Sequence, residues 1–367
     1  MSLSPSEVDD LLKRCTNVLP GHGPRRTIAE SMREVADWLV GNEQADVYGK
    51  GDYLQAFEAE VAEMFGKPAA VFMPSGTMAQ QVALRIWCDR NGRNTVAMHP
   101  TAHLEFAEHL AYQYLHRLHR LQFGGPEFIS HRMLTIEDFQ ALGGTPGAVL
   151  LELPYRPLGG QLPPWDDLEA TRAWATERGV ALHLDGARIW QCRGYYDKTY
   201  ADIGALFDSI YVSFYKELGA FSGAMLLGPE DFIQEARVWQ RRHGGNLFTL
   251  APFVASARMG LANTLPRLED WVRKAREIGG IMATIQGVRI NPDPVQVNFF
   301  QVYFEGERDA LVDRHHLLAG ETGTFLFRDL RESGVPGLAT TELHMFENAM
   351  NFDAHQLAPF LERLMDV

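Results

Sequence analysis

The sequence predicts an α/β protein with a large domain, built on a mostly parallel sheet flanked by helices, and a small α+β C-terminal domain. Short apolar runs alternate with helical patterns over residues 68–228, which is typical of a parallel sheet. After about residue 255 the pattern changes to helices followed by short alternating strands. With 46% hydrophobic and 22% charged residues, the 367-residue chain can build one large core and a smaller one.

The large domain begins with helical patterns and continues into apolar strands. Residues 28–40 and 52–66 carry apolar side chains at helical spacing, and 68–73 (PAAVFM) is a short apolar run between two prolines. A helix is expected over 165–179, between two of the later strands. The further buried strands are predicted at 95–99, 148–153, 180–184, 209–214 and 223–228.

The C-terminal part is expected to contain helices over 266–285, strands at 297–304 and 323–328, and a last helix near 353–366. Neither an internal repeat nor a long Pro- or Gly-rich linker separates independent units. We therefore expect an N-terminal segment (1–40) that packs with the small domain, a large domain (41–255) and a small domain (256–367).

Composition excludes several classes of function. The formal charge is −13, from 34 basic and 47 acidic residues, and the basic residues form no long run, so nucleic acid is not an expected partner. The start of the chain lacks an apolar signal core, and no run of about 18 apolar residues is present, so a cytoplasmic protein without a membrane span is expected. Cys15, Cys88 and Cys192 lack CxxC spacing, which predicts reduced thiols and no zinc site.

The first motif that could take part in ligand binding or catalysis is MPSGTMAQQVAL (73–84). It places Ser75, Gly76 and Thr77 directly after a buried strand and before a helix, where backbone N–H groups and two hydroxyls meet at a helix N-terminus. That arrangement suits a phosphate group. An ordinary serine N-cap is the alternative for this motif taken alone.

The second motif, VALHLDGARIW (180–190), ends an apolar strand in Asp185, with Arg188 three residues later. An aspartate at the carboxyl end of a strand lies where open α/β sheets bind ligands. Its carboxylate could keep a pyridine nitrogen protonated, which would make the ring an electron sink. An aspartate that only caps the next helix is the alternative.

The third motif, SIYVSFYKELGAFSGAMLLG (209–228), places Lys216 after another apolar strand in a segment rich in glycine and aromatic residues. Desolvation there would favour a neutral amine that can form an imine, and Ser213 could add a phosphate contact. A lone lysine at such a position is more often an ordinary surface residue. The order of the three motifs is more specific than any one of them.

Taken together, these motifs resemble the threonine aldolase and β-eliminating lyase family of fold-type I enzymes dependent on pyridoxal 5′-phosphate (PLP). The resemblance runs from about residue 47 to 260, and PSGTM and HLDGAR are its most specific pieces. It implies a PLP-dependent transferase-like fold, a Schiff base between PLP and Lys216, and a ring nitrogen held by Asp185. Ser75, Gly76, Thr77 and Ser213 would then bind the cofactor.

The resemblance also assigns roles to further residues. His103, in AHLEFAE, corresponds to the histidine that stacks on the cofactor ring and assists proton transfer, and Glu108 to an acidic residue five positions later. Arg188 corresponds to an arginine that contacts the cofactor or the substrate carboxylate. Tyr48 corresponds to a Tyr-Gly element near the active site.

Other stretches depart from the family pattern. The N-terminal Arg-Ser-Asp-Thr element is replaced by PGHGPRRT (20–27), with His22 near the position of the substrate-contacting serine. After Glu152 the family's Asn-Thr-His is replaced by 153–155 (LPY). The paired glycines of RRHGGNLFT (241–249) match a loop that reaches a neighbouring subunit, which implies a homodimer or homotetramer with shared active sites.

Three functions follow as alternatives. The first is a carbon–carbon lyase that cleaves a β-hydroxy amino acid of the threonine or allo-threonine type to glycine and an aldehyde, with His103 as the base for the hydroxyl. The second is β-elimination from a β-substituted amino acid to a keto acid and ammonia, with Lys216 removing the Cα proton. The third is a catalytically silent ligand-binding protein. Neither GxxxxGK[ST] nor GxGxxG follows a strand, which argues against P-loop and nicotinamide enzymes.

The remaining histidines suggest no metal site. His109, His116 and His119 are expected on one helical stretch, without a carboxylate cluster at ligand spacing.

Overall fold

The structure is a computed structural model that describes residues 3–23, 26–123 and 131–366. The chain divides into two compact units. The larger unit comprises residues 27–157 and 162–266, and the smaller unit comprises the remainder. The division into three parts at 40/41 and 255/256 stays a prediction.

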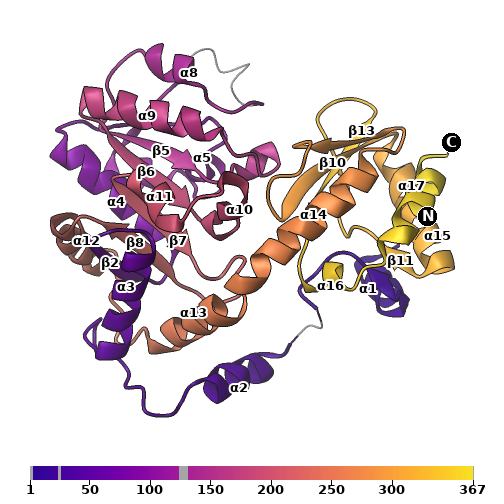
Figure 1. The fold of residues 1–367 in the computed structure, drawn as a ribbon, viewed down its shortest axis with the longest axis horizontal. Coiled ribbons are helices and arrows are strands. Elements are labelled where there is room, and N and C mark those ends of the chain that lie inside the picture. Colours follow the sequence, from indigo (N-terminus) through magenta and orange to yellow (C-terminus); the bar gives the residue numbers. More distant parts are fainter. Residues whose placement is uncertain (1–2, 24–25, 124–130, 367) are drawn as a thin grey trace. The chain divides into compact units, whose positions relative to one another are not determined.

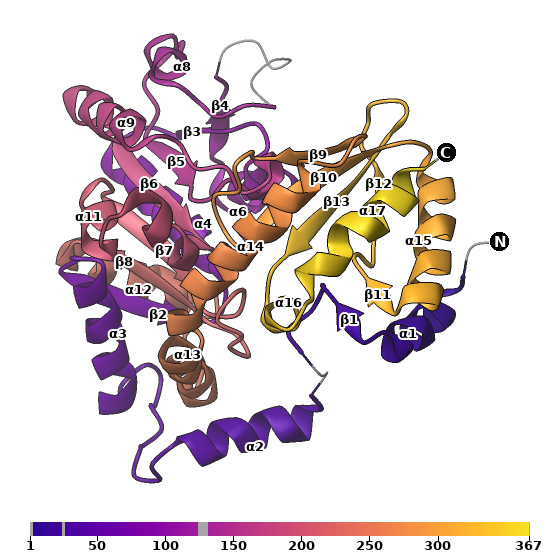
Figure 2. The same cartoon turned by 45° about the vertical axis from the view of Figure 1, so that its right-hand side comes forward.

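The larger unit is built on a seven-stranded sheet with the strand order β2-β8-β7-β6-β5-β3-β4 (Figure 1 and Figure 2). The strands are β2 (Ala69–Met73), β3 (Thr95–Met98), β4 (His119–Leu121), β5 (Ala148–Glu152), β6 (Ala181–Gly186), β7 (Ser209–Ser213) and β8 (Ala224–Gly228). The run from β4 through β7 is parallel, whereas β8 is antiparallel to both β7 and β2. The expectation of a mostly parallel α/β sheet is confirmed.

Helices cover both faces of this sheet, which explains why the central strands are apolar along their whole length. Val71 and Met73 of β2 pack on the face covered by α4 and α12. Phe72 points the other way and contacts Phe57 of α3. The helices of this unit are α2 (Ile28–Trp38), α3 (Asp52–Met64), α4 (Gly76–Arg90), α5 (His103–Phe106), α6 (Ala111–His116), α8 (Ile136–Gln140), α9 (Trp165–Arg178), α10 (Arg193–Tyr196), α11 (Tyr200–Ala205), α12 (Glu230–Arg242) and α13 (Ala251–Asn263).

The smaller unit contains a four-stranded antiparallel sheet in the order β12-β13-β10-β9 (Figure 2). Its strands are β9 (Val288–Asn291), β10 (Phe299–Glu305), β12 (Arg331–Glu332) and β13 (Leu338–His344). Alternate residues of β13 are buried, so one face of this sheet packs on a core. The helices are α1 (Pro5–Arg14), α14 (Leu268–Met282), α15 (Arg308–Thr322), α16 (Glu347–Met350) and α17 (Leu357–Met365).

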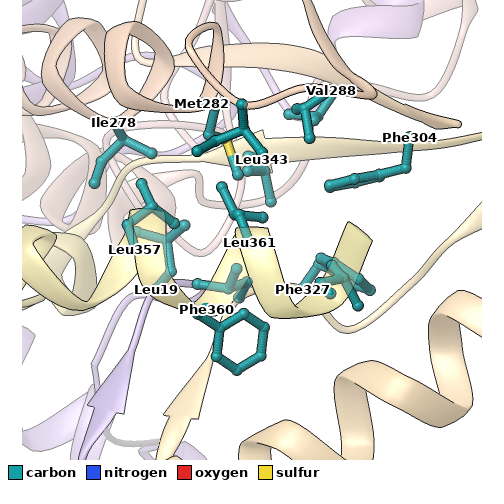
Figure 3. Packing of buried hydrophobic residues seen from close by; sticks show 14 of the residues in the cluster. Leu19, Ile278, Met282, Val288, Phe304, Phe327, Leu343, Leu357, Phe360 and Leu361 are labelled. Atoms are coloured by element: carbon teal, nitrogen blue, oxygen red, sulfur yellow. The ribbon is translucent and has the colours of Figure 1, made fainter. Parts of the chain in front are cut away.

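The core of the smaller unit joins residues from both ends of the chain (Figure 3). Leu19 lies among Ile278 and Met282 of α14 and Leu357 and Leu361 of α17. The N-terminal strand β1 (Asn17–Val18) pairs in parallel with β11 (Thr324–Phe325). The start of the chain is therefore an integral part of this unit.

One local prediction is wrong. His109, His116 and His119 do not share a helix, because α6 covers only Ala111–His116 and His119 begins β4. His109 and Arg117 have positive φ angles of 51° and 56°, and this left-handed backbone interrupts a helix on both sides of α6.

No helix within the described residues is both long enough and apolar enough to cross a membrane.

Candidate active site

A pocket opens at the carboxyl ends of the central parallel strands of the larger unit. Its charged and titratable lining residues are His103, Glu152, Asp185, Arg188 and Lys216, together with Arg156 at the rim. Leu153 and Pro154 supply part of the apolar wall. Open α/β sheets bind ligands at this edge, because the strand ends and the following loops converge there.

Asp185 lies at the end of β6, one residue before the strand's last residue. Its side chain is buried, and Oδ1 accepts a hydrogen bond of 3.0 Å from the backbone N–H of Ala187. Burial raises the pKa of Asp185, and the nearby Lys216 opposes that shift. A cationic neighbour therefore favours the ionised form of this carboxyl.

Lys216 follows β7 by three residues and lines the same pocket as Asp185. Burial is the main cause that lowers its pKa, and the charge of Arg188 acts in the same direction. The carboxyl groups of Asp185, Glu217 and Glu152 oppose the shift. The amine thus has a larger neutral, nucleophilic fraction near pH 7 than an exposed lysine has.

His103 is the first residue of α5 and has a half-exposed side chain. Its Nδ1 lies 3.0 Å from Oε1 of Glu108, whose other oxygen accepts a 2.9 Å hydrogen bond from Nε2 of Gln81. Because Glu108 is an acceptor, this contact places a proton on Nδ1 of His103. The Nε2 lone pair of the neutral ring is then available to accept a proton.

Glu152 is a pocket residue that the sequence motifs did not single out. It ends β5 with a buried side chain, and Oε1 accepts a 2.6 Å hydrogen bond from the backbone N–H of His103. Burial and the neighbouring Asp185 raise its pKa. The available signal was its position, because AVLLE ends in a carboxylate at the same edge of the sheet as HLD.

Arg188 and Glu217 form an ion pair beside the pocket. Nε of Arg188 lies 2.9 Å from Oε1 of Glu217, and the two side chains are 15% and 2% exposed. Glu217 directly follows Lys216 in the chain. The motif containing Lys216 therefore also supplies the carboxylate partner of Arg188.

The predicted phosphate loop has the expected local structure. Ser75 is the N-cap of α4, and its Oγ accepts a 3.3 Å hydrogen bond from the N–H of Met78. Gly76 lies against Tyr211, since a Cβ atom at this position would be 1.9 Å from the phenol oxygen. Thr77 is exposed in the first turn.

Ser213, the last residue of β7, is fully buried, and its Oγ has no hydrogen-bond partner among the described residues. Ser75, Gly76, Thr77 and Ser213 are not among the residues that line the Lys216 pocket.

Two further predicted residues occupy other surroundings. His22 belongs to the smaller unit, where its ring stacks on Phe346 with centroids 3.6 Å apart. Tyr48 has a positive φ of 51°, packs edge-on against Phe248 and lines a different cavity, together with Lys50 and Arg237.

The whole-chain comparisons agree with this arrangement. The model of the beta-eliminating lyase family matches residues 26–305, which include every residue of the pocket. The chain belongs to the beta-eliminating lyase family. Its pocket is built from residues that this family match spans, whereas the last strands and helices of the smaller unit lie outside it.

Several named members and relatives resemble the chain over most of its length. Low-specificity L-threonine aldolase 1 of Arabidopsis thaliana is 26% identical over 295 residues, which cover 77% of this chain and 80% of that protein. A crystal structure from Listeria monocytogenes EGD-E, provisionally named an L-allo-threonine aldolase, is 35% identical with a TM-score of 0.91 and covers 98% of both chains. Sphingomonas wittichii serine palmitoyltransferase, at 16% identity and a TM-score of 0.67 over 95% of this chain and 86% of its own, shares the fold.

Proposed function

We propose that this member of the beta-eliminating lyase family is a PLP-dependent carbon–carbon lyase that cleaves a β-hydroxy amino acid to glycine and an aldehyde. The observation that carries the proposal is the meeting of the Lys216 amine and the Asp185 carboxyl in one pocket at the ends of parallel strands. The Arabidopsis and Listeria relatives, named as aldolases of threonine and allo-threonine, support the substrate class.

The chemistry of the available donors fits PLP. The Lys216 amine, with its lowered pKa, would hold the cofactor covalently through Nζ, and the Asp185 carboxylate would hold its ring nitrogen. The N-terminus of α4 at Ser75, Gly76 and Thr77 suits a phosphate. Ser213 Oγ is a buried hydroxyl without a partner among the described residues, and it could donate a hydrogen bond to the same phosphate.

When bound, PLP supplies an electron sink for the pair of electrons released at Cα. The residues of the chain do the rest. Asp185 would hold the ring nitrogen in its protonated form, which would strengthen that sink. His103 accepts the proton of the substrate's β-hydroxyl at Nε2, while Glu108 holds the ring in the required tautomer through Nδ1. Removal of that proton allows the Cα–Cβ bond to break with formation of an aldehyde.

Substrate recognition is proposed for three residues. Arg188 lines the pocket and carries a planar guanidinium that suits a carboxylate. His22 and Tyr48 stay predicted substrate contacts, on the basis of the family pattern alone.

β-Elimination is the second candidate, and the name of the family favours it. In that reaction Lys216 would take the proton from Cα, a β substituent would leave with its bonding electrons, and hydrolysis of the resulting enamine by water would give a keto acid and ammonia. The same pocket residues serve both reactions, so the orientation of the substrate decides between them.

The experiment that tests the proposal is product analysis with the PLP-loaded protein. Threonine, allo-threonine, phenylserine and β-chloroalanine are supplied separately, and glycine, aldehyde, keto acid and ammonia are measured. Glycine with an equimolar aldehyde supports the lyase. A keto acid with ammonia assigns the protein to β-elimination, and PLP binding without any product would leave a silent ligand-binding protein.

We also propose a homodimer or homotetramer in the cytoplasm. Exposed apolar side chains at Tyr48, Leu247 and Phe248 support self-association, because such clusters commonly mark protein interfaces. The free cysteines Cys15, Cys88 and Cys192 agree with a reducing compartment.

A further inference from the structure

The ion pair between Arg188 and Glu217 is buried beside the proposed catalytic lysine. Their 2.9 Å contact joins the turn after β6 to the residue that follows Lys216. Glu217 has a side chain that is only 2% exposed, and its Oε2 is buried without a hydrogen-bond partner among the described residues. Arg188 is therefore the ion-pair partner of this buried glutamate.

Stability alone is a poor explanation for such a pair. Removing two charges from water costs several kcal/mol per ion, and buried pairs are often replaced by apolar residues without loss of stability. A buried carboxylate with one oxygen that lacks a hydrogen-bond partner lowers the stability of a core further. The position of Arg188 in the pocket wall suggests a different use for Glu217.

The contact restrains the orientation of the guanidinium. A guanidinium is planar and carries five N–H donors in a fixed fork. The Glu217 carboxylate, 2.9 Å from Nε, restrains the position of the group through its charge, and a guanidinium can bind a second carboxylate in a bidentate way. An arginine held in advance loses less side-chain entropy when the anion arrives.

The contact also balances charge around Lys216. The charge of Arg188 lowers the pKa of Lys216, whereas Glu217 raises it. Glu217 thus reduces the effect that Arg188, in the pocket wall, has on the pKa of the Lys216 amine.

We propose, as an extension of the function proposed above, that Glu217 is a positioning residue that holds Arg188 for the carboxylate of the amino-acid substrate. Glu217 itself touches neither the substrate nor the cofactor. Its effect is exerted through Arg188, so it concerns binding of the carboxylate more than the bond-breaking step.

The test uses Glu217→Gln, which keeps the shape of the side chain and removes its charge. With the PLP-loaded protein, we expect KM for the β-hydroxy amino acid to rise about tenfold and kcat to change less than about threefold. The reason is that the carboxylate contact stabilises the bound substrate and the transition state equally. Absorbance titration of the bound cofactor gives a readout without turnover. Glycine should bind about tenfold more weakly to the variant, whereas ethylamine, which lacks a carboxylate, should bind equally well to both proteins.

Two further variants separate positioning from a loss of stability. Glu58→Gln removes another buried carboxylate, which pairs with Arg237 outside the Lys216 pocket, and it should lower stability without changing the ratio of glycine to ethylamine affinity. Arg188→Lys should weaken glycine binding by itself, and Glu217→Gln added to it should weaken binding no further, because the two residues act as one unit.

The outcomes are distinct. Equal weakening of glycine and ethylamine by Glu217→Gln, or additive effects of the two substitutions, would overturn the positioning role. A wild-type protein that forms no product and shows no cofactor absorbance would overturn the proposed function instead.

Discussion

Glu152 and Asp185 are direct neighbours in the register of the parallel strands β5 and β6. Both side chains are buried, at 6% and 5% exposure, and line one pocket. Burial raises the pKa of each, and the charge of Asp185 raises that of Glu152 further. For Asp185 the chief opposing influence is Lys216. The pKa of Glu152, raised to about 8, favours its protonated form near pH 7, whereas Lys216 favours the ionised form of Asp185.

Glu152→Gln is expected to keep most of the activity. The amide oxygen can still accept the hydrogen bond from the N–H of His103, and no charge is lost if Glu152 is already neutral. Glu152→Ala leaves that N–H without its acceptor and should cost about 1–3 kcal/mol of stability. Steady-state kinetics and urea denaturation of both variants measure this difference. Equal inactivation by both would mean that the Glu152 charge is needed.

Asp185→Asn should cause a severe loss of activity with PLP still detectable by absorbance. The neutral amide cannot hold a proton on the ring nitrogen, so the electron sink is weakened. Rates are measured with saturating PLP, so that weaker cofactor binding does not contribute. Near-normal rates would refute the role of Asp185.

Lys216→Ala should abolish turnover, because the variant lacks the amine of the lysine that lines the pocket. The fold should stay intact. Borohydride reduction should attach PLP permanently to the wild type and not to the variant. Mass spectrometry detects the added mass. Lys13→Ala, at an exposed residue of α1 that pairs with Asp10, is the matched control and should remain labelled. Wild-type activity in Lys216→Ala would contradict the covalent attachment.

Gly76→Ala tests the contact between the phosphate loop and β7. The new Cβ would lie 1.9 Å from the Tyr211 oxygen, so we expect a loss of about 1–3 kcal/mol in stability together with weaker PLP binding. Gly280→Ala, in an exposed turn of α14 with nothing within 4 Å, should instead gain about 0.5–1 kcal/mol. In a Tyr211→Ala background, which removes the ring that the new Cβ would meet, Gly76→Ala should cost less than it does in the wild type. A Gly76→Ala protein as stable as the wild type would show that the loop can move.

His183 should make stability dependent on pH. Its ring is fully buried between Ser209 Oγ at 2.7 Å and Gln80 Oε1 at 2.8 Å, and burial lowers its pKa from 6.5 to about 3. Between these two values the unfolded chain binds the proton and the folded chain does not, so stability falls as the pH falls through this window. One such histidine contributes about 1.4 kcal/mol per pH unit. In urea denaturation from pH 7.5 to 4.5, His183→Gln should show a slope smaller by that amount, and an unchanged slope would contradict the assignment.

Much of the larger unit could be predicted from the sequence because its strands are covered on both faces. Continuous apolar runs such as AVLLE and SIYVS are direct signals of such strands, and each carries its functional residue at or just after the carboxyl end. Asp185 and Lys216 could therefore be placed at one edge of the sheet. The antiparallel direction of β8 follows from the absence of a helix between Ser213 and Ala224.

Other features depend on contacts between distant residues. Glu217 differs from an ordinary surface glutamate only through its pairing with Arg188, which a turn after another strand supplies. Tyr211 meets Gly76 across 135 positions of sequence, and no local pattern indicates this approach. The helix expected across His109 to His119 does not form because Arg117 has a left-handed backbone. Glycine usually marks such a position in a sequence, and an arginine there gives no signal.

The register of β5, β6 and β7 has a consequence for how sequence changes are tolerated. Asp185 lies on the same side of β6 as His183, which contacts Gln80 of α4, so an insertion of one residue earlier in β6 would present Leu184 there and turn the carboxyl to the opposite side. Substitutions in the apolar part of the strand leave this parity intact. These strands should therefore tolerate substitutions much better than insertions or deletions, even at positions where no side chain touches a ligand.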